Sequence, residues 1–163
     1  MSQLHHVKKS NEALRASASK QSLRAWLYLL QCTKRLEQKM SNRFRRNNNT
    51  SLSRFDVLAN LDHAGGNELS TSQLADRLLS SKGNITRLLD RMEKDALIVR
   101  KASLEDRRVS TICLSKKGAE LFSRMAREHE IWAHEILGIL SASEVAQLIN
   151  ILKTIKGKLS RWE

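Results

Sequence analysis

Hydrophobic residues recur at spacings of three and four along most of the chain, which is the pattern of amphipathic helices. The predicted helices span residues 20–46, 53–64, 70–79, 82–95, 115–140 and 141–159. Residues 1–19 are polar, and we expect a loose arm or a short helix there. The chain contains no proline that would interrupt a helix. The sequence therefore predicts a mostly α-helical protein.

Local signals mark several ends of these helices. Ser70 with Gln73, and Ser141 with Glu144, have the spacing of a capping box, in which two side chains satisfy the first free backbone N–H groups of a helix. Gly65-Gly66 is expected to end the helix that begins near residue 53. These signals separate the short helices in the middle of the chain from the long ones on either side.

The pattern changes after residue 95. Two short β-prone runs, Leu97–Lys101 and Val109–Leu114, flank the charged segment Ala102–Arg108. Two strands joined by a basic loop, directly after a pair of short helices, form the wing of a winged helix-turn-helix. The predicted fold class is therefore mostly α with a small β-wing.

The net charge of the chain narrows the class of molecule that it is expected to bind. The 163 residues include 29 Lys and Arg against 17 Asp and Glu, for a net charge of +12. This excess favours a polyanionic partner, either nucleic acid or an anionic membrane surface. Aromatic residues make up only 4 % of the chain, which argues against a stacking platform for single strands.

The cellular location is inferred from signals that the sequence lacks. It has no apolar run near the ~20 residues needed to span a bilayer and no secretory signal. Its two cysteines, Cys32 and Cys113, do not make a disulfide framework. We therefore expect a cytoplasmic, nucleoid-associated protein of a bacterial cell, without a membrane partner.

The segment 82–95 separates into two faces on a helical wheel. Its apolar face consists of Ile85, Leu88, Leu89 and Met92, and its polar face of Gly83, Thr86, Arg87, Asp90 and Lys94, with Arg91 at the edge. The apolar face is expected to pack on the helix at 70–79, and the polar face to enter a major groove, which admits one α-helix. Arg87 can bond guanine through two N–H groups. Asp90 is expected to pair with Arg87 or Lys94.

The loop of the hairpin adds a second contact with DNA. Arg107 and Arg108 suit insertion into a narrow minor groove, and Asp106 is expected to hold an arginine or cap the turn. The predicted DNA-contacting residues are Ser70, Thr71, Ser81, Lys82, Gly83, Asn84, Thr86, Arg87, Arg91, Asp106, Arg107 and Arg108. An ordinary solvated helix face beside a charged hairpin is the alternative.

From Phe55 to Gly118, about 40 % of the chain, the sequence resembles the multiple-antibiotic-resistance regulator (MarR) family. The matching stretches are Phe55–Leu58, Leu74–Leu78, Gly83–Glu93, Asp106–Arg108 and Leu114–Gly118. The Asp-Arg-Arg triplet, followed six residues later by Leu-Ser-Lys-Lys-Gly, is the most specific part.

The resemblance implies a homodimeric transcription regulator, in most members a repressor, that binds a pseudo-palindromic operator in double-stranded DNA. It divides the chain into an N-terminal arm with the first dimerisation helix (1–46), a winged helix-turn-helix DNA-binding domain (53–118) and C-terminal dimerisation helices (119–163). The half-sites would lie one helical turn apart, about 10 base pairs. Many members release DNA when a small molecule, often an aromatic acid, binds.

The resemblance also places an effector pocket where the first, second and fifth helices meet. The candidate ligand-binding residues are Arg24, Trp26, Tyr28, Leu29, Cys32, His63 and Trp132. Arg24 can pair with a carboxylate, Trp26, Tyr28 or Trp132 can flank a ring, and His63 can bond a phenol. The alternative is that the tryptophans belong to the core and the histidine is structural.

Other functions have weaker support. A redox switch is a rival mode, but neither cysteine lies where peroxide-sensing relatives carry theirs. His129 and His134 lie five residues apart, on different faces of a helix, and no cysteine pair has zinc spacing, so we expect no metal or cofactor. The chain has no P-loop, dinucleotide-binding glycine pattern or nucleophile elbow, so we expect no enzyme. An architectural DNA-binding protein without sequence preference remains the alternative.

Overall fold

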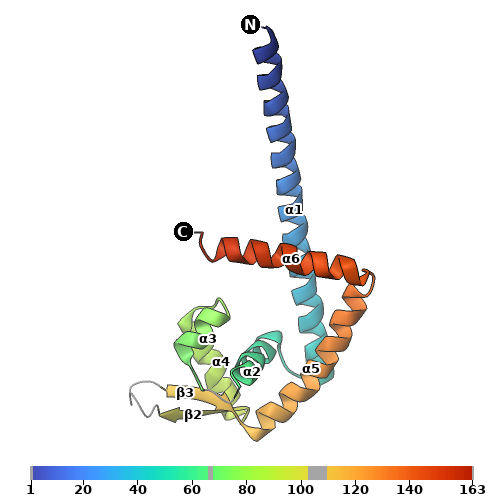
Figure 1. The fold of residues 1–163 in the computed structure, drawn as a ribbon. Helices are drawn as coiled ribbons and strands as arrows, with labels where there is room; N and C mark the ends of the chain where they lie inside the picture. Colours follow the sequence, from blue (N-terminus) through green and yellow to red (C-terminus); the bar gives the residue numbers. More distant parts are fainter. Residues whose placement is uncertain (1, 66–67, 103–109, 163) are drawn as a thin grey trace. The chain divides into compact units, whose positions relative to one another are not determined.

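The computed structural model describes residues 2–65, 68–102 and 110–162, in two compact units that meet between Leu52 and Ser53. The first unit consists mainly of one helix, α1 (Ser2–Asn48) (Figure 1). This helix includes residues 2–19, for which the sequence predicted a loose arm or a short helix. The difference has a simple reason, because neither glycine nor proline occurs before Gly65, so nothing in this stretch ends a helix.

The second unit carries the remaining elements, and these confirm the predicted winged helix-turn-helix fold. In chain order they are α2 (Leu52–His63), β1 (Leu69–Ser70), α3 (Thr71–Arg77), α4 (Lys82–Lys94), β2 (Ile98–Ala102), β3 (Ser110–Leu114), α5 (Lys116–Leu137) and α6 (Ala142–Leu159). Both predicted capping boxes are present, at the starts of α3 and α6. The helix α2 ends before Gly65, whose φ of 63° lies in the left-handed region that glycine adopts without strain.

The strands form an antiparallel sheet in the order β1-β3-β2 within the described residues. The sequence predicted β2 and β3 but not β1, which is only two residues long. Residues directly opposite one another on neighbouring strands point to the same face. One face therefore carries Leu69, Ile112 and Arg100, and the other carries Ser70, Thr111 and Lys101.

The core of the second unit is formed by apolar side chains from its helices and from the inner face of the sheet. Its buried members include Val57, Leu58, Leu74, Leu89, Met92, Ile112 and Met125. The rings of Phe55 on α2 and Phe122 on α5 lie 5.8 Å apart, so α5 packs on α2 near its first turns. This packing joins the base of the winged helix-turn-helix to the long helix that follows it.

The helices α5 and α6 bend by 106° at the break between them, and α6 has no buried side chain. In the described part of the chain no single helix has the length and hydropathy to cross a membrane, and the bent pair of α5 and α6 passes that test only when the two are taken together. The apolar residues of α6 thus lie on its surface.

Candidate nucleic-acid interface

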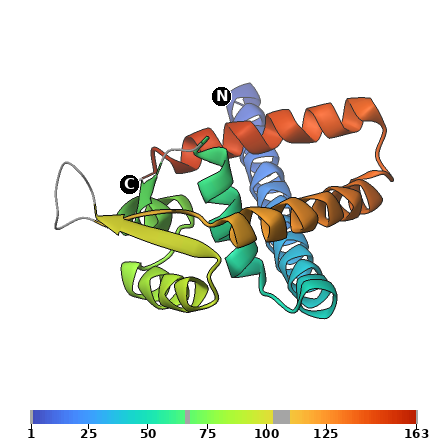
Figure 2. The ribbon, with the colours of Figure 1, turned by 90° about the horizontal axis from the view of Figure 1, so that it is seen from below.

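The helix α4 has the two faces that its sequence predicts. Ile85, Leu89 and Met92 are buried and Leu88 is half-buried. The predicted contact residues on its other side are all exposed: Ser81, Lys82, Gly83, Asn84, Thr86, Arg87 and Arg91. Figure 2 shows α4 beside α3 and the β2–β3 hairpin, all in the second unit. The polar surface is therefore held by a buried apolar face.

The N-terminal end of α4 can accept an anion. Ser81 is the N-cap, and its hydroxyl accepts a hydrogen bond from the N–H of Asn84 at 3.3 Å, which leaves the hydroxyl proton for another acceptor. A Cβ atom built on Gly83 would meet nothing within 4 Å, so the backbone there is open to a close approach. Helix N-termini attract phosphate because their first N–H groups are free and the helix dipole is positive there.

The side chain of Arg87 lies back along its own helix. Its Nη2 donates to the Asn84 Oδ1 at 2.8 Å, and its Nε donates to the Gly83 carbonyl at 3.3 Å. Thr86 likewise donates its hydroxyl to the Lys82 carbonyl at 2.9 Å. These contacts fix the direction of the guanidinium over the first turns of α4, where a base edge would lie in a docked major groove.

The partner of Asp90 differs from the one predicted. Asp90 was expected to pair with Arg87 or Lys94, but its Oδ1 accepts from Arg100 Nη2 on β2 at 2.5 Å. The Nε of Arg100 lies 3.5 Å from a Glu93 oxygen, which is an ion-pair distance without a hydrogen bond. Arg100 can reach α4 because it lies on the same face of the sheet as Ile112. It therefore compensates two carboxylates that would otherwise repel DNA.

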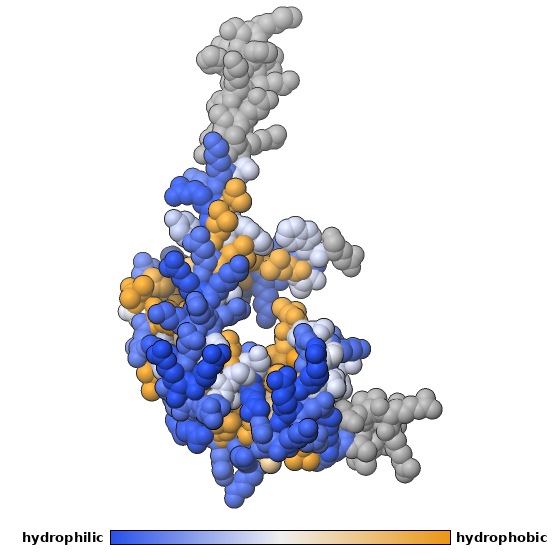
Figure 3. Space-filling model, turned by 180° about the vertical axis from the view of Figure 1, so that it is seen from behind, coloured by the Kyte–Doolittle hydropathy of each residue, from blue (hydrophilic) through white to orange (hydrophobic). Residues whose placement is uncertain are grey.

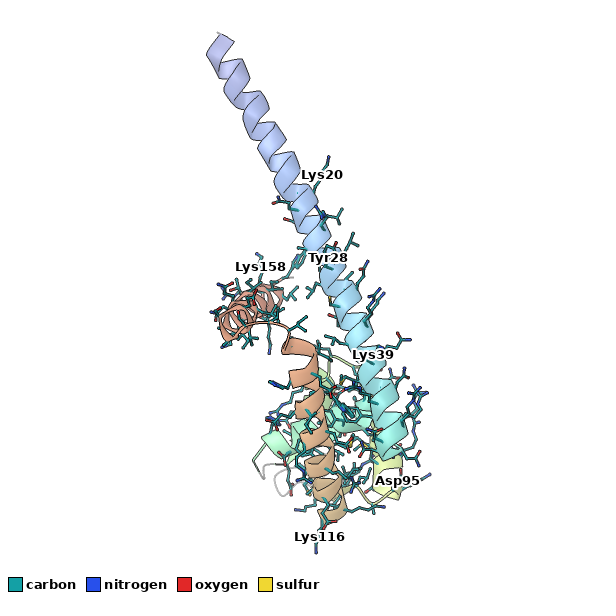
Figure 4. The ribbon with its side chains drawn as sticks, turned by 90° about the vertical axis from the view of Figure 1, so that its right-hand side faces the viewer. Lys20, Tyr28, Lys39, Asp95, Lys116 and Lys158 are labelled. Atoms are coloured by element: carbon teal, nitrogen blue, oxygen red, sulfur yellow. The ribbon has the colours of Figure 1, made fainter. Side chains whose placement is uncertain are left out.

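The C-terminal end of α4 is tied to two other helices, α2 and α5. Asp95 forms an ion pair with Arg54 on α2, and its carbonyl accepts from Lys117 Nζ on α5 at 2.9 Å. Ser115 donates to the Ala96 carbonyl at 2.6 Å. In Figure 4 the labelled residues Asp95 and Lys116 lie toward the same end of the second unit. A shift of the first turn of α5 would therefore reach α4 directly.

A polar cluster closes the base of the wing. Glu68 accepts from Lys101 Nζ at 2.7 Å and from the Thr111 hydroxyl. The hydrogen bonds from Lys101 and Thr111 lower the pKa of the Glu68 carboxyl below its ordinary value. The bond to Glu68 raises the pKa of Lys101 in turn. The sequence did not single out Glu68 or Arg100, although the alternation of the β-prone run places Arg100 on the side of Ile98.

The remaining predicted DNA contacts divide into two groups. Ser70 and Thr71 are half-buried at the start of α3, where Ser70 accepts from the N–H of Gln73 at 3.2 Å and acts as the N-cap. Asp106, Arg107 and Arg108 lie outside the described residues. Their contacts with DNA stay a prediction from the sequence.

The predicted ligand-binding residues belong to both units. Arg24, Trp26, Tyr28 and Cys32 are exposed on α1 and Leu29 is half-buried there; Figure 4 labels Tyr28 on this helix. In the second unit, His63 is exposed with its Nδ1 2.8 Å from the Ala59 carbonyl, and Trp132 is buried. Thus α1 carries five of the seven candidates, and the effector pocket stays a prediction.

Among the residues that the structure describes, no group of three His, Cys, Asp or Glu side chains could hold a metal ion. Cys32 is exposed on α1, and Cys113 is half-buried on β3 with its Sγ 3.8 Å from the Val99 carbonyl. Both thiols are free.

Comparison with known proteins agrees with this architecture. The sequence model of the MarR family matches residues 49–109. The HTH-type transcriptional regulator MhqR of Bacillus subtilis (strain 168) is 35 % identical over 101 residues, which are 62 % of this chain and 68 % of MhqR. The transcriptional repressor MprA of Escherichia coli (strain K12) is 30 % identical over 109 residues, which are 67 % of this chain and 62 % of MprA.

Among solved structures, Streptococcus pneumoniae FabT in complex with DNA has a similar fold. Its TM-score is 0.73, with 22 % identity over 86 % of this chain and 98 % of FabT. At this identity the likeness shows the fold alone. The relatives, the family match and the exposed polar face of α4 together show that the chain belongs to the MarR family of winged helix-turn-helix transcription regulators, which are not enzymes.

Proposed function

We propose that this protein is a homodimeric, sequence-specific repressor that leaves a pseudo-palindromic operator when a small aromatic acid binds. The observation that carries the DNA-binding part is the face of α4. Its exposed side presents Lys82, Asn84 and Arg87 near a capped N-terminus and Arg91 in the last turn, and Arg100 compensates its acidic residues. A helix of this kind has the donors that read base edges in the major groove.

The dimer is supported by the apolar surface of the long helices. Leu23, Trp26 and Leu27 are about half exposed on α1, at 58 %, 50 % and 47 %. Figure 3 shows apolar side chains gathered along α1. On α6, Leu152 and Leu159 are exposed at 41 % and 50 %, and no side chain of that helix is buried. Monomeric proteins rarely leave such apolar stretches in water, so a second copy is the occupant we propose.

A dimer also fits the charge and the operator symmetry. Two chains of +12 carry +24, which favours association with DNA through release of counterions. Two copies of α4 related by a two-fold axis would meet half-sites about 10 base pairs apart. The name of the relative MprA, a transcriptional repressor, supports repression as the output.

The DNA-reading role is tested by replacing Arg87. Arg87→Ala is expected to cost about 1–3 kcal/mol of operator binding and to relax the preference for one base pair, because a bidentate contact to guanine is lost. Arg124→Ala on α5 is the matched control, because Arg124 is exposed and its replacement removes the same charge at a position outside α4. If both variants bind the operator with the same affinity, the docking of α4 is wrong.

The effector part has a separate test. Titration with benzoate and hydroxybenzoates is expected to lower operator affinity of the wild type, and Arg24→Met is expected to weaken this response because the carboxylate loses its partner. Glu37→Gln, a change in a charged residue on the same helix outside the predicted pocket, should respond like the wild type. Unchanged operator affinity with every acid in the series would remove the aromatic-acid proposal without affecting DNA binding.

A further inference from the structure

A small polar cluster joins all three strands at the base of the wing. Glu68 precedes β1, Lys101 lies on β2 and Thr111 lies on β3. The Glu68 carboxylate accepts from Lys101 Nζ at 2.7 Å through one oxygen and from the Thr111 hydroxyl through the other. Both oxygens are therefore used within the sheet, and each bond reaches a different strand.

The cluster lies on the outer face of the sheet. Ser70 is opposite Thr111 on β3, and Lys101 is opposite Thr111 on β2, so the three side chains share one face. The opposite face carries Leu69 and Ile112, both buried in the core. Lys101, on the outer face, is exposed, so the burial of the inner face does not extend to this corner of the hairpin.

The strand β1 links this corner to the helix-turn-helix. It is only two residues long and pairs with β3 at Leu69 and Ser70, so the ladder itself supplies few hydrogen bonds. Ser70 is also the N-cap of α3, two residues after Glu68. A bond from Glu68 to the hairpin is therefore a bond from the start of α3 to the wing. The cluster lies one residue pair inside the last described pair, Ala102 and Ser110.

We propose that Glu68 is a positioning residue for the wing: by binding Lys101 and Thr111 together, its carboxylate holds the hairpin in the direction that brings the wing to DNA. This inference rests on the proposed DNA-binding function and on the prediction from the sequence that Arg107 and Arg108 contact the minor groove. Glu68 itself touches no DNA in this scheme. Its carboxylate also engages the ammonium of Lys101 and so keeps that charge within the sheet.

The role is one of orientation more than of stability. Lys101 is exposed, and exposed ion pairs contribute little to folding because water and salt screen them. The Glu68 carboxyl is ionised at neutral pH in any case, and the hydrogen bonds from Lys101 and Thr111 lower its pKa further below the ordinary value. The bonds therefore restrict where the hairpin points while adding little to the free energy of unfolding.

The change in net charge caused by Glu68→Ala separates two explanations of its effect on DNA affinity. Glu68→Ala removes one negative charge, so the net charge rises from +12 to +13. Electrostatics alone predicts equal or tighter DNA binding from this change. Loss of wing orientation predicts weaker binding. The two explanations thus predict opposite directions for the same variant.

The experiment measures operator affinity by fluorescence anisotropy in two backgrounds, one with the native wing and one carrying Arg107→Ala and Arg108→Ala. Each background receives Glu68→Ala, Thr111→Val or the matched control Glu120→Ala. Glu120 is exposed on α5, and its loss changes the net charge equally. Thr111→Val removes one hydroxyl and keeps a β-branched residue in the strand, so it remains informative if Glu68→Ala folds poorly.

With the native wing, Thr111→Val, which removes one of the two hydrogen bonds to Glu68, is expected to weaken binding about fivefold. Glu68→Ala, which removes both, is expected to weaken it at least as much, while Glu120→Ala binds equally or more tightly. In the background without wing arginines, neither variant should weaken binding further. Equal or tighter binding by both variants in the native background, or the same weakening in both backgrounds, overturns the positioning role. If the loss of both arginines alone leaves affinity unchanged, the wing contact of the proposed function fails and the positioning role fails with it.

Discussion

Among the described glycines, Gly118 is the one at which an added methyl group should lower the free energy of unfolding most. It lies in the first turn of α5, and a Cβ atom built on it would lie 1.9 Å from the Leu97 carbonyl oxygen and 2.9 Å from the carbonyl carbon. Ordinary contact begins at 3.4 Å, so relief requires a movement of about 1.5 Å, from 1.9 to 3.4 Å. The obstacle is backbone, which cannot rotate away as a side chain would.

The required movement would break more than one contact. The same Leu97 carbonyl accepts from the N–H of Ser115 at 3.1 Å, and the Ser115 hydroxyl caps α5 by accepting from the N–H of Gly118 at 2.9 Å. Overpacking costs about 1–3 kcal/mol, and a lost N-cap costs about 1 kcal/mol. We expect Gly118→Ala to lower the free energy of unfolding by about 2–4 kcal/mol.

Gly83→Ala is the matched control. Nothing lies within 4 Å of a Cβ atom at Gly83, and alanine suits a helix better than glycine, so stability should rise by up to about 1 kcal/mol. Operator affinity should nevertheless fall, because the added methyl group stands where the backbone of α4 would approach DNA. Gly118→Ala is measured by urea unfolding at one fixed protomer concentration, since association makes stability depend on concentration. A change below about 0.5 kcal/mol for Gly118→Ala, the range of an ordinary surface substitution, would refute the packing at Leu97.

Three further predictions concern backbone strain, charge and pH. Leu79 has a φ of 49° and is 95 % exposed, so Leu79→Gly should raise the free energy of unfolding by about 0.5–1 kcal/mol in urea unfolding, whereas a decrease would mean that the leucine has a contact. Arg100→Met should weaken operator binding about threefold to tenfold, as expected for like charges near DNA, and Asp90→Asn should restore it in that background; no restoration would mean that Arg100 binds DNA itself. The backbone N–H and hydroxyl of Ser141 lower the pKa of Glu144 below its ordinary value of 4.5. Its ionised form therefore stabilises α6 above pH 4.5, and this contribution is lost as the pH falls through the lower folded value. Glu144→Gln should reduce the unfolding midpoint at pH 7 and match the wild type in strong acid, and a constant difference at every pH would contradict this linkage.

The features that the sequence predicted correctly depend on local signals. The capping boxes of Ser70 and Ser141 need only residues three apart, and the buried side of α4 follows from helical periodicity. The strand β1 escaped prediction because two residues carry no alternation, and its partner lies more than 40 residues away on β3. Pairing between distant strands is set by the fold and leaves no short-range signal in the chain.

The candidate site shows the same division. The exposed residues of α4 were found from the sequence, since one face of a helix is defined by spacing. The partner of Asp90 was predicted wrongly because helical neighbours were considered, while the true partner, Arg100, reaches it from the sheet. Glu68 was missed for the same reason, since its two bonds join strands that are separate in the sequence.

These charge contacts change how the DNA-facing surface is understood. When the sequence is considered alone, a recognition helix with Asp90 and Glu93 is poorly suited to a polyanion. Arg100 on β2 offsets the negative charge of both carboxylates, while Arg87 and Lys82 stay on the exposed side of α4. The sheet therefore supports the wing and also determines the electrostatic character of α4.

The most direct test of the central claim is the ratio between binding to one selected DNA site and binding to random DNA. The site would be obtained by selection from a random library, and both affinities measured with the full-length protein at physiological salt. A sequence-reading dimer should enrich a pseudo-palindrome and bind it at least about 10³ times more tightly than random DNA. A ratio near one, with affinity lost only as salt rises, would show an architectural DNA-binding protein and contradict the account.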